Sequence, residues 1–178
     1  RGSELFEAIT ELPEYYPTRT ERAILTAAAP EIARRVGAGR AVVEFGSGSS
    51  TKTPILLSAI APAAYVPIDI SGAFLRESVA ALRPAFPDLA IRPIEGDFTR
   101  RIALPEDCDA ALRLGFFPGS TIGNLQAAAA VDLLRAMGQT LGDQAMLLIG
   151  IDRIKDPAIL VAAYDDAQGV TAAFNLNL

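Results

Sequence analysis

Residues 41–50 read Ala-Val-Val-Glu-Phe-Gly-Ser-Gly-Ser-Ser, an apolar run that ends in a glycine-rich turn. The run predicts a buried strand over residues 41–45, and Pro54 predicts the first turn of a helix over residues 53–60. Glycines allow the backbone to turn tightly between these elements and to approach a ligand closely. A strand, a glycine turn and a helix in this order are typical of a parallel α/β sheet.

The same alternation continues along the rest of the chain. Further strands are predicted over residues 65–70, 90–95, 114–117 and 145–151. Helices are predicted over residues 18–36, 72–83 and 125–137, and from residue 156 onward. Apolar strands that alternate with helices indicate an α/β fold, a doubly wound parallel sheet with helices on both faces.

Three local signals refine this pattern. Proline cannot donate to a sheet, so Pro67 places the second strand near an edge or at a bulge. Thr18 and Glu21 have the spacing of a capping box at the start of the first long helix. The strand over residues 145–151 is apolar throughout, as expected for a central strand. If it lies at an edge of this chain, its unpaired backbone groups favour self-association.

The composition excludes several classes of function. The 178 residues carry 16 Lys and Arg against 21 Asp and Glu, and the net charge of −5 argues against nucleic-acid binding. The absence of His removes imidazole as a metal ligand or base, and the single Cys108 excludes a disulfide framework. No apolar run approaches the roughly 20 residues of a membrane span, and no signal peptide is recognisable. We therefore expect a cytoplasmic protein with a small-molecule partner.

Candidate ligand-binding residues follow the predicted strands, at the edge where parallel sheets bind ligands. They are Gly46, Gly48, Asp69, Asp97, Phe98, residues 119–124 and residues 152–156. Asp69 stands 21 positions after Gly48 and can accept both hydroxyls of a ribose, or can simply favour a helix N-terminus. Asp97 and Phe98 can bond an adenine amino group and cover its ring, or can form a turn and a core contact.

The chemistry of these positions favours a nucleoside that carries a positive charge. A dinucleotide fingerprint requires a glycine at position 51, where Thr51 stands, so a plain turn or a nucleoside site remains. Glu44 lies inside a strand predicted to be buried and is expected to bond a backbone N–H or a ligand ammonium. Acids at the strand ends, without a phosphate-binding cluster, fit S-adenosylmethionine (SAM), which combines ribose, adenine, an amino acid and a sulfonium.

Longer motifs resemble one enzyme family. The most specific motifs are the Tyr-Tyr-Pro-Thr-Arg segment and the Gly-Ser-Thr-Ile-Gly-Asn segment. The full resemblance rests on residues 12–21, 44–53, 65–71, 96–98, 119–124, 156–157, 163–166, 169–172 and 174–175. In these stretches the chain is similar to the ergothioneine-pathway histidine N-alpha-methyltransferases, SAM-dependent enzymes that trimethylate the α-amine of L-histidine.

The resemblance implies a role for each matching residue. Cofactor binding falls to Gly46, Lys52, Asp69, Asp97 and Phe98. Amino-acid binding falls to Tyr16, Gly119, Asn124 and Tyr164. Asn124 and Tyr164 would hold the substrate α-carboxylate, and Tyr16 would lie near and orient the amine. Without the resemblance, Tyr16 and Tyr164 also fit core packing, Lys52 fits a solvated helix, and Asn124 fits a helix cap.

The resemblance also implies a Rossmann-like class I methyltransferase fold with strand order 3-2-1-4-5. Two further strands would come from a missing C-terminal part, and we expect a fragment because the chain lacks an initiating Met and ends within a helical pattern. The expected units are a cap segment over residues 1–20, a helix over residues 21–39 that can belong to the substrate domain, a SAM-binding domain over residues 40–156, and the start of a truncated substrate domain over residues 157–178.

The implied reaction is in-line methyl transfer to a neutral amine, without a metal. An ordinary phenol pKa of about 10 makes Tyr16 a poor base, so the base stays unassigned. This chain alone is expected to be inactive, because the residues that would read an imidazole are missing. Two alternatives remain open: methylation of another amino-acid amine, and a cofactor-binding module without catalysis. A nicotinamide dehydrogenase is disfavoured by Thr51 and by the absence of His.

Overall fold

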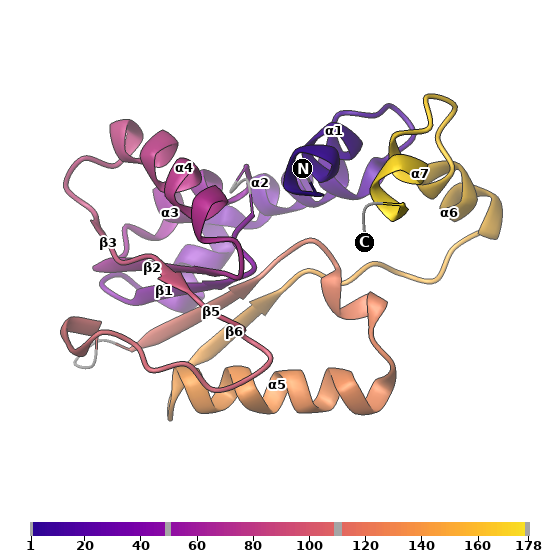
Figure 1. The fold of residues 1–178 in the computed structure, drawn as a ribbon. Helices are drawn as coiled ribbons and strands as arrows, with labels where there is room; N and C mark the ends of the chain where they lie inside the picture. The colour runs from indigo at the N-terminus through magenta and orange to yellow at the C-terminus, as the bar shows by residue number, and fades with distance from the viewer. Residues whose placement is uncertain (1, 49–50, 109–111, 177–178) are drawn as a thin grey trace.

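A central parallel sheet organises the computed structural model, which describes residues 2–48, 51–108 and 112–176 (Figure 1). Its strand order is β3-β2-β1-β5-β6, and β4 also pairs with β2. The predicted order 3-2-1-4-5 is confirmed, with the third predicted strand divided into β3 and β4. The strands are β1 (Ala41–Phe45), β2 (Ala64–Asp69), β3 (Ala90–Ile91), β4 (Ile94–Glu95), β5 (Arg113–Phe117) and β6 (Met146–Ile149).

Helices cover both faces of the sheet. In Figure 1, α2, α3 and α4 lie on one face and α5 lies on the other, which confirms the doubly wound arrangement. The helices are α1 (Gly2–Thr10), α2 (Tyr16–Val36), α3 (Thr53–Ile60), α4 (Gly72–Leu82), α5 (Ala127–Leu141), α6 (Pro157–Tyr164) and α7 (Val170–Asn175). Short 3-10 turns are η1 (Arg83–Ala85), η2 (Glu106–Cys108) and η3 (Thr121–Asn124).

The central strand β1 separates two apolar cores, and all five of its residues are buried. Successive side chains of a strand point to opposite faces. Val42 therefore packs with Leu57 of α3 in one core, whereas Val43 and Phe45 pack with Met137 of α5 in the other. This double burial explains why the β1 sequence is apolar without alternation.

Pro67 lies near an edge of the sheet, as predicted, although β2 is not itself the edge strand. β2 pairs with β1 on one side and with β3 and β4 on the other. The carbonyls of Tyr65 and Asp69 accept hydrogen bonds from the N–H groups of Arg92 and Gly96, on the β3–β4 side. Pro67 lies midway between Tyr65 and Asp69, so its backbone nitrogen faces the same β3–β4 side. Its missing N–H falls where β3 ends and β4 has not begun, so no ladder bond is lost there.

The capping box predicted for the first long helix is absent. α2 begins at Tyr16, before Thr18, and no side chain caps it. Pro17 occupies its first turn, where a missing N–H costs nothing. Thr18 is buried, and the Glu21 carboxylate bonds groups outside the helix. Glu21 is therefore available for the site described below.

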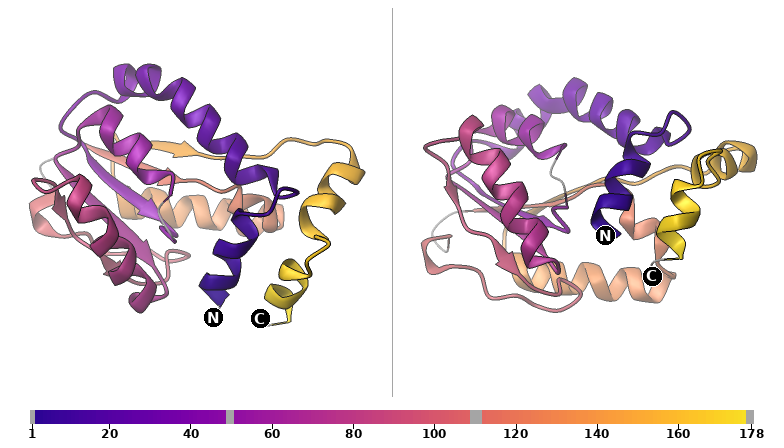
Figure 2. Two further views of the ribbon diagram at one scale, coloured as in Figure 1. Left: turned by 90° about the horizontal axis from the view of Figure 1, so that it is seen from above. Right: turned by 45° about the horizontal axis from the view of Figure 1, so that its top comes forward.

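Two helices distant in sequence lie side by side. α1 and α7 run next to each other in both views of Figure 2, and Phe6 contacts Phe174 with ring centroids 6.1 Å apart. Ile9, Leu12 and Tyr15 form a small buried cluster with α7 residues. The residues between α1 and α2 are thereby fixed at both ends, which positions the beginning of α2.

The last strand of the described sheet is β6, which pairs with β5. Leu147 of this strand is 37% exposed. No helix of the described residues is long and apolar enough to cross a membrane.

Candidate active site

The glycine turn after β1 lies closely against the Phe98 ring. Gly46 has a φ of +70°, a conformation that L residues rarely adopt, and a Cβ there would lie 3.3 Å from the Phe98 ring. The N–H groups of Gly46 and Ser47 donate to the Ile68 carbonyl at 2.9 and 3.1 Å. The turn is thus fastened to the end of β2, and the Phe98 ring borders Gly46 closely.

Asp69 connects the ends of β1 and β2. Its Oδ2 accepts the Gly48 N–H at 3.1 Å, and its Oδ1 accepts the Ser71 N–H at 2.9 Å. Each carboxylate oxygen retains further acceptor capacity. Asp69 therefore fixes the glycine turn and the start of α4, and can still accept hydroxyl groups.

Asp97 and Phe98 follow β4. Asp97 Oδ1 accepts the hydroxyl of Thr99 at 2.7 Å and its N–H at 2.9 Å, and these bonds lower the pKa of Asp97. Phe98 packs edge-on against Phe45 and Phe117, with centroids 6.2 and 5.9 Å apart. The turn and the ring contacts match the structural alternative, and the Phe98 ring also lies beside Gly46.

Glu44 is a buried acid in the middle of the sheet. Its Oε2 accepts the hydroxyls of Thr53 at 2.7 Å and Tyr65 at 2.6 Å, so its described partners are hydroxyls rather than the expected backbone N–H. Burial raises the pKa of Glu44 to about 7, against the lowering effect of these two hydroxyls. Glu44 also lines a pocket at the glycine turn.

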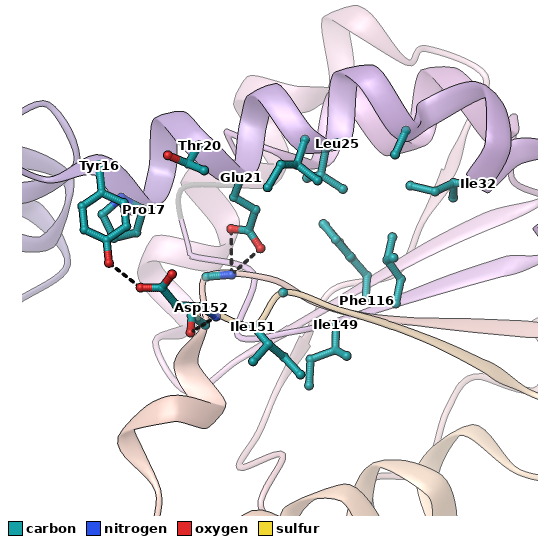
Figure 3. A pocket seen from close by; sticks show the side chains of 16 residues that line it. Tyr16, Pro17, Thr20, Glu21, Leu25, Ile32, Phe116, Ile149, Ile151 and Asp152 are labelled. Atoms are coloured by element: carbon teal, nitrogen blue, oxygen red, sulfur yellow. Dashed lines mark hydrogen bonds between the residues drawn. The ribbon is translucent and has the colours of Figure 1, made fainter. Parts of the chain in front are cut away.

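Two pockets meet at Gly119, in the loop after β5. The smaller one, of about 100 Å³, lies at the glycine turn and is lined by Glu44, Gly46, Gly48, Lys52, Gly119 and the α1 residues Phe6 and Thr10, among others. The larger one, of about 340 Å³, lies between α2 and the ends of β5 and β6 (Figure 3). Its polar end is formed by Tyr16, Glu21, Gly119, Ser120 and Asp152. Its apolar end includes Leu25, Ile32, Phe116 and Leu148.

Glu21 lies between the two pockets. Its two carboxylate oxygens each accept the Gly119 N–H at 2.9 Å, and it forms an ion pair with Lys52. The Glu21 and Lys52 side chains are only 17% and 14% exposed. Gly150 stands against this carboxylate, because a Cβ at Gly150 would overlap Glu21 and approach the Gly119 nitrogen to 3.3 Å. Lys52 is therefore held toward Gly119 by a partner on α2.

Tyr16, at the start of α2, points toward the residues that follow β6. Figure 3 shows its hydroxyl directed at Asp152. The hydroxyl donates to Asp152 Oδ2 and accepts a hydrogen bond from Lys155 Nζ at 2.7 Å. Lys155 also pairs with Asp152 Oδ1 at 2.5 Å and lies 3.9 Å from the centre of the Tyr16 ring. The predicted residue Tyr16 thus belongs to a charged cluster at the polar end of the larger pocket.

Asn124 and Tyr164 line neither of these two pockets. Asn124 ends η3 and is exposed. Tyr164 ends α6 and is 51% exposed, and its ring meets Tyr15 edge-on at 5.6 Å. Burial, followed by the neighbouring Tyr164, raises the pKa of Tyr15 above its ordinary range. The structure therefore brings Tyr164 near the start of α2 without bringing it to Gly119.

Several site residues were not singled out from the sequence. The sequence places Glu21 in a capping box, and it includes Asp152 and Lys155 only within the candidate stretch 152–156, without individual roles. Arg19 belongs to the Tyr-Tyr-Pro-Thr-Arg segment, but the sequence assigns it no role of its own. Its guanidinium donates to the carbonyls of Leu12, Pro13 and Tyr15, so it fixes the loop that carries Tyr16. Spacing gave no signal for these contacts because they join segments that are distant in sequence.

Within the described residues, no group of three or more His, Cys, Asp or Glu side chains is arranged to hold a metal ion.

Comparison with known proteins extends these observations. The family model described as "Histidine-specific methyltransferase, SAM-dependent" matches residues 1–178. Histidine N-alpha-methyltransferases of Mycolicibacterium smegmatis and Mycobacterium tuberculosis are 44% and 42% identical over 99% of this chain. The chain spans about half of their length, 56% in both cases. The ergothioneine biosynthesis protein 1 of Neurospora crassa is 34% identical, with 21% of its length covered.

Solved structures agree on the fold. A putative methyltransferase from Thermobifida fusca aligns with a TM-score of 0.60 at 17% identity, over 89% of this chain and 63% of the other. A didemethyltoxoflavin N1-methyltransferase from Burkholderia thailandensis aligns with a TM-score of 0.54 at 13% identity, over 83% and 60%. These likenesses show the class I methyltransferase fold expected from the sequence. With the family model matching its whole length, this chain belongs to the SAM-dependent, histidine-specific methyltransferase family.

Proposed function

We propose that this chain supplies the cofactor site and part of the amino-acid site of an enzyme that trimethylates the α-amine of L-histidine. The observation that carries the proposal is the meeting of two pockets at Gly119, one at the glycine turn and one at Tyr16. Methyl transfer requires its two reactants to be held in adjoining sites with the reacting atoms aligned. The two reactants are SAM and the amino acid, which would be held at the glycine turn and at Tyr16, respectively.

The smaller pocket and the strand ends beside it carry groups that SAM requires, although Asp69, Asp97 and Phe98 do not line that pocket. Because Gly46 has no side chain, a ligand would be able to approach the backbone beside the Phe98 ring. Asp69 retains acceptor capacity for ribose hydroxyls. Asp97 would accept a hydrogen bond from the adenine amino group, and the adjacent Phe98 would cover the adenine ring. The buried acid Glu44 and the cation Lys52 line the same pocket, where they would face the ammonium and the carboxylate of the methionine part. When bound, SAM supplies a methyl group on a sulfonium to a nitrogen lone pair, and the S–C electron pair returns to sulfur.

The larger pocket would hold the amino acid at its polar end. Tyr16 and Gly119 line that end, and Tyr16 would orient the amine. Asn124 and Tyr164 are proposed to hold the α-carboxylate, which requires the segments after β5 and α6 to approach Gly119 when substrate binds. The side chain of histidine would be read by residues outside this chain. We retain residues 40–156 as the proposed cofactor-binding unit and residues 157–178 as part of the substrate unit.

Transfer of radiolabelled methyl groups from SAM to a panel of amino acids tests the proposal. The full-length protein should label L-histidine in preference to other amino acids. The 178-residue chain alone should bind S-adenosylhomocysteine and transfer little. Preferred labelling of another amino acid would show a different substrate, and binding without any transfer by the full-length protein would show a non-catalytic module.

A further inference from the structure

The hydroxyl of Tyr16 has a fixed hydrogen-bond polarity. A carboxylate only accepts hydrogen bonds and an ammonium only donates them. The hydroxyl proton is therefore directed to Asp152, and one oxygen lone pair is directed to Lys155. One lone pair remains, and the oxygen lies at the polar end of the larger pocket (Figure 3). Tyr16 is consequently arranged to accept a hydrogen bond from a ligand rather than to donate one.

The two partners of Tyr16 are themselves held in place. Asp152 Oδ1 accepts the Arg153 N–H at 2.8 Å and pairs with Lys155 at 2.5 Å. The Asp152 N–H donates to the Ser120 hydroxyl at 2.8 Å, which ties the cluster to the loop after β5. The Lys155 and Asp152 side chains are 21% and 31% exposed. The cluster is therefore built from two loop segments, after β5 and after β6, that meet at the phenol at the start of α2.

The protonation states of the cluster are stable near neutral pH. Burial, followed by the hydrogen bond to Asp152, raises the pKa of Tyr16. Burial alone would raise the pKa of Asp152, but the bonds from Lys155 and Tyr16 outweigh it and lower that pKa. Burial opposes the charge of Lys155, yet its bonds to Asp152 and Tyr16 raise the pKa of Lys155. The cluster thus combines a neutral phenol, a carboxylate and an ammonium, and it contains no strong base.

We propose that Asp152 and Lys155 are positioning residues that make the Tyr16 hydroxyl an acceptor for an N–H of the substrate amine. This inference rests on the proposed function. A neutral amine attacks with its only lone pair, so a hydroxyl that donated to the nitrogen would occupy the electrons that must form the new N–C bond. A hydroxyl that accepts an N–H instead leaves the lone pair free and fixes its direction.

The three successive methylations then depend on the cluster unequally. A neutral primary amine has two N–H bonds, a monomethylated amine has one, and a dimethylated amine has none. The acceptor function of Tyr16 therefore serves the first two transfers and has nothing to accept in the third. A residue that only stabilised the fold would affect all three transfers in the same proportion.

The test compares L-histidine with α-N,N-dimethyl-L-histidine as substrates of the full-length protein. Lys155→Met and Asp152→Ala should lower kcat/KM for histidine by about 10-fold to 100-fold, the size of effect that misplaced reactants produce. The same variants should change kcat/KM for the dimethylated amine by less than about twofold. The ratio of the two values does not depend on how much of a variant is folded.

Two further variants sharpen the result. Arg34→Gln removes an exposed cation from the far end of α2, where it pairs with Glu31, and should leave both rates unchanged, whereas Lys155→Arg should restore part of the histidine rate. In a Tyr16→Phe background, Lys155→Met should cause no further loss with histidine. Equal losses of kcat/KM with the two substrates, or an additive loss in the Tyr16→Phe background, would overturn this inference and leave the proposed function standing. Failure of the unmodified protein to methylate either amine would overturn the proposed function and the inference with it.

Discussion

The Glu21 carboxylate accepts the Gly119 N–H with both of its oxygens, at 2.9 Å each, although 98 positions separate the two residues. The same carboxylate pairs with Lys52. One acid of α2 thus joins the loop after β5, where the two pockets meet, to the residue that precedes α3. The geometry at this junction is therefore set by a side chain of α2 whose described hydrogen bonds and ion pair go to Gly119 and Lys52.

Glu21→Gln should therefore destabilise the protein. The substitution leaves the largely buried Lys52 without its counter-ion and weakens a charged bond to Gly119, so the free energy of unfolding should fall by about 1–3 kcal/mol. Urea unfolding measures this change. Glu31→Gln is the matched control, because Glu31 pairs only with exposed arginines of the same helix and should leave the unfolding midpoint unchanged. Equal unfolding midpoints for the two variants would contradict the claim that the contacts of Glu21 with Lys52 and Gly119 stabilise the fold.

Gly150→Ala should be destabilising for a steric reason. A Cβ at Gly150 would overlap the Glu21 carboxylate beside Gly119, which should cost about 1–3 kcal/mol of unfolding free energy. Gly138→Ala is the opposite case, because no atom lies within 4 Å of a Cβ there and the residue is inside α5. That variant should gain about 0.5–1 kcal/mol. Thermal unfolding of both variants tests the contrast, and a stabilised Gly150→Ala protein would show that Glu21 is free to move away.

The buried acid Glu44 should make stability depend on pH. Its pKa is about 7 in the folded chain and 4.5 as an unperturbed group, so the folded state binds the proton more tightly. Stability linked to Glu44 is fully present below about pH 4.5 and is lost as pH rises toward 7, a change on the order of 3 kcal/mol. Glu44→Gln should remove this part of the dependence. Parallel pH profiles for the two proteins would contradict the raised pKa.

Asp69→Ala should weaken binding of S-adenosylhomocysteine by about 1–3 kcal/mol, the range for hydrogen bonds to a charged acceptor. Isothermal titration calorimetry of the full-length protein measures the change. Asp88→Ala removes an exposed acid from a loop on the way to β3 and serves as the control. Unchanged affinity in Asp69→Ala would remove Asp69 from the ribose site and leave it a purely structural role at the glycine turn.

The edge at β6 leads to a prediction about the 178-residue chain. We expect two copies to associate along β6, because this strand is apolar and carries no Lys or Pro that would oppose pairing. Leu147→Lys should abolish association while sparing the core, since Leu147 is 37% exposed. Sedimentation at micromolar concentration distinguishes the outcomes. A monomer with rapidly exchanging β6 amides would show that the edge is tolerated.

Much of the fold was predictable from local sequence. The run over residues 41–45 is apolar because β1 is buried on both faces, and the glycines that follow it are required by positive φ angles. Pro67 is tolerated in β2 because the third predicted strand is interrupted opposite it, between β3 and β4, so the missing N–H costs no ladder bond. The capping box failed because Glu21 gains more from Lys52 and Gly119 than from its own helix end.

The candidate site was predictable only in part. Positions at strand ends could be found because parallel strands bring their ends together. The partners of Tyr16 could not, since Asp152 lies 136 positions away and charged residues after a strand are common in solvated loops. Asn124 and Tyr164 were assigned by resemblance, and the structure leaves both outside the two pockets. Their role depends on residues or movements that local sequence does not encode.

The proposed activity of the full-length protein is the transfer of methyl groups from SAM to the α-nitrogen of histidine. Mass spectrometry with fragmentation of L-histidine incubated with the full-length protein and SAM tests this most directly. The account predicts a product that carries three methyl groups, all on the α-nitrogen. Methyl groups on an imidazole nitrogen, or unmodified histidine in the presence of bound SAM, would contradict it.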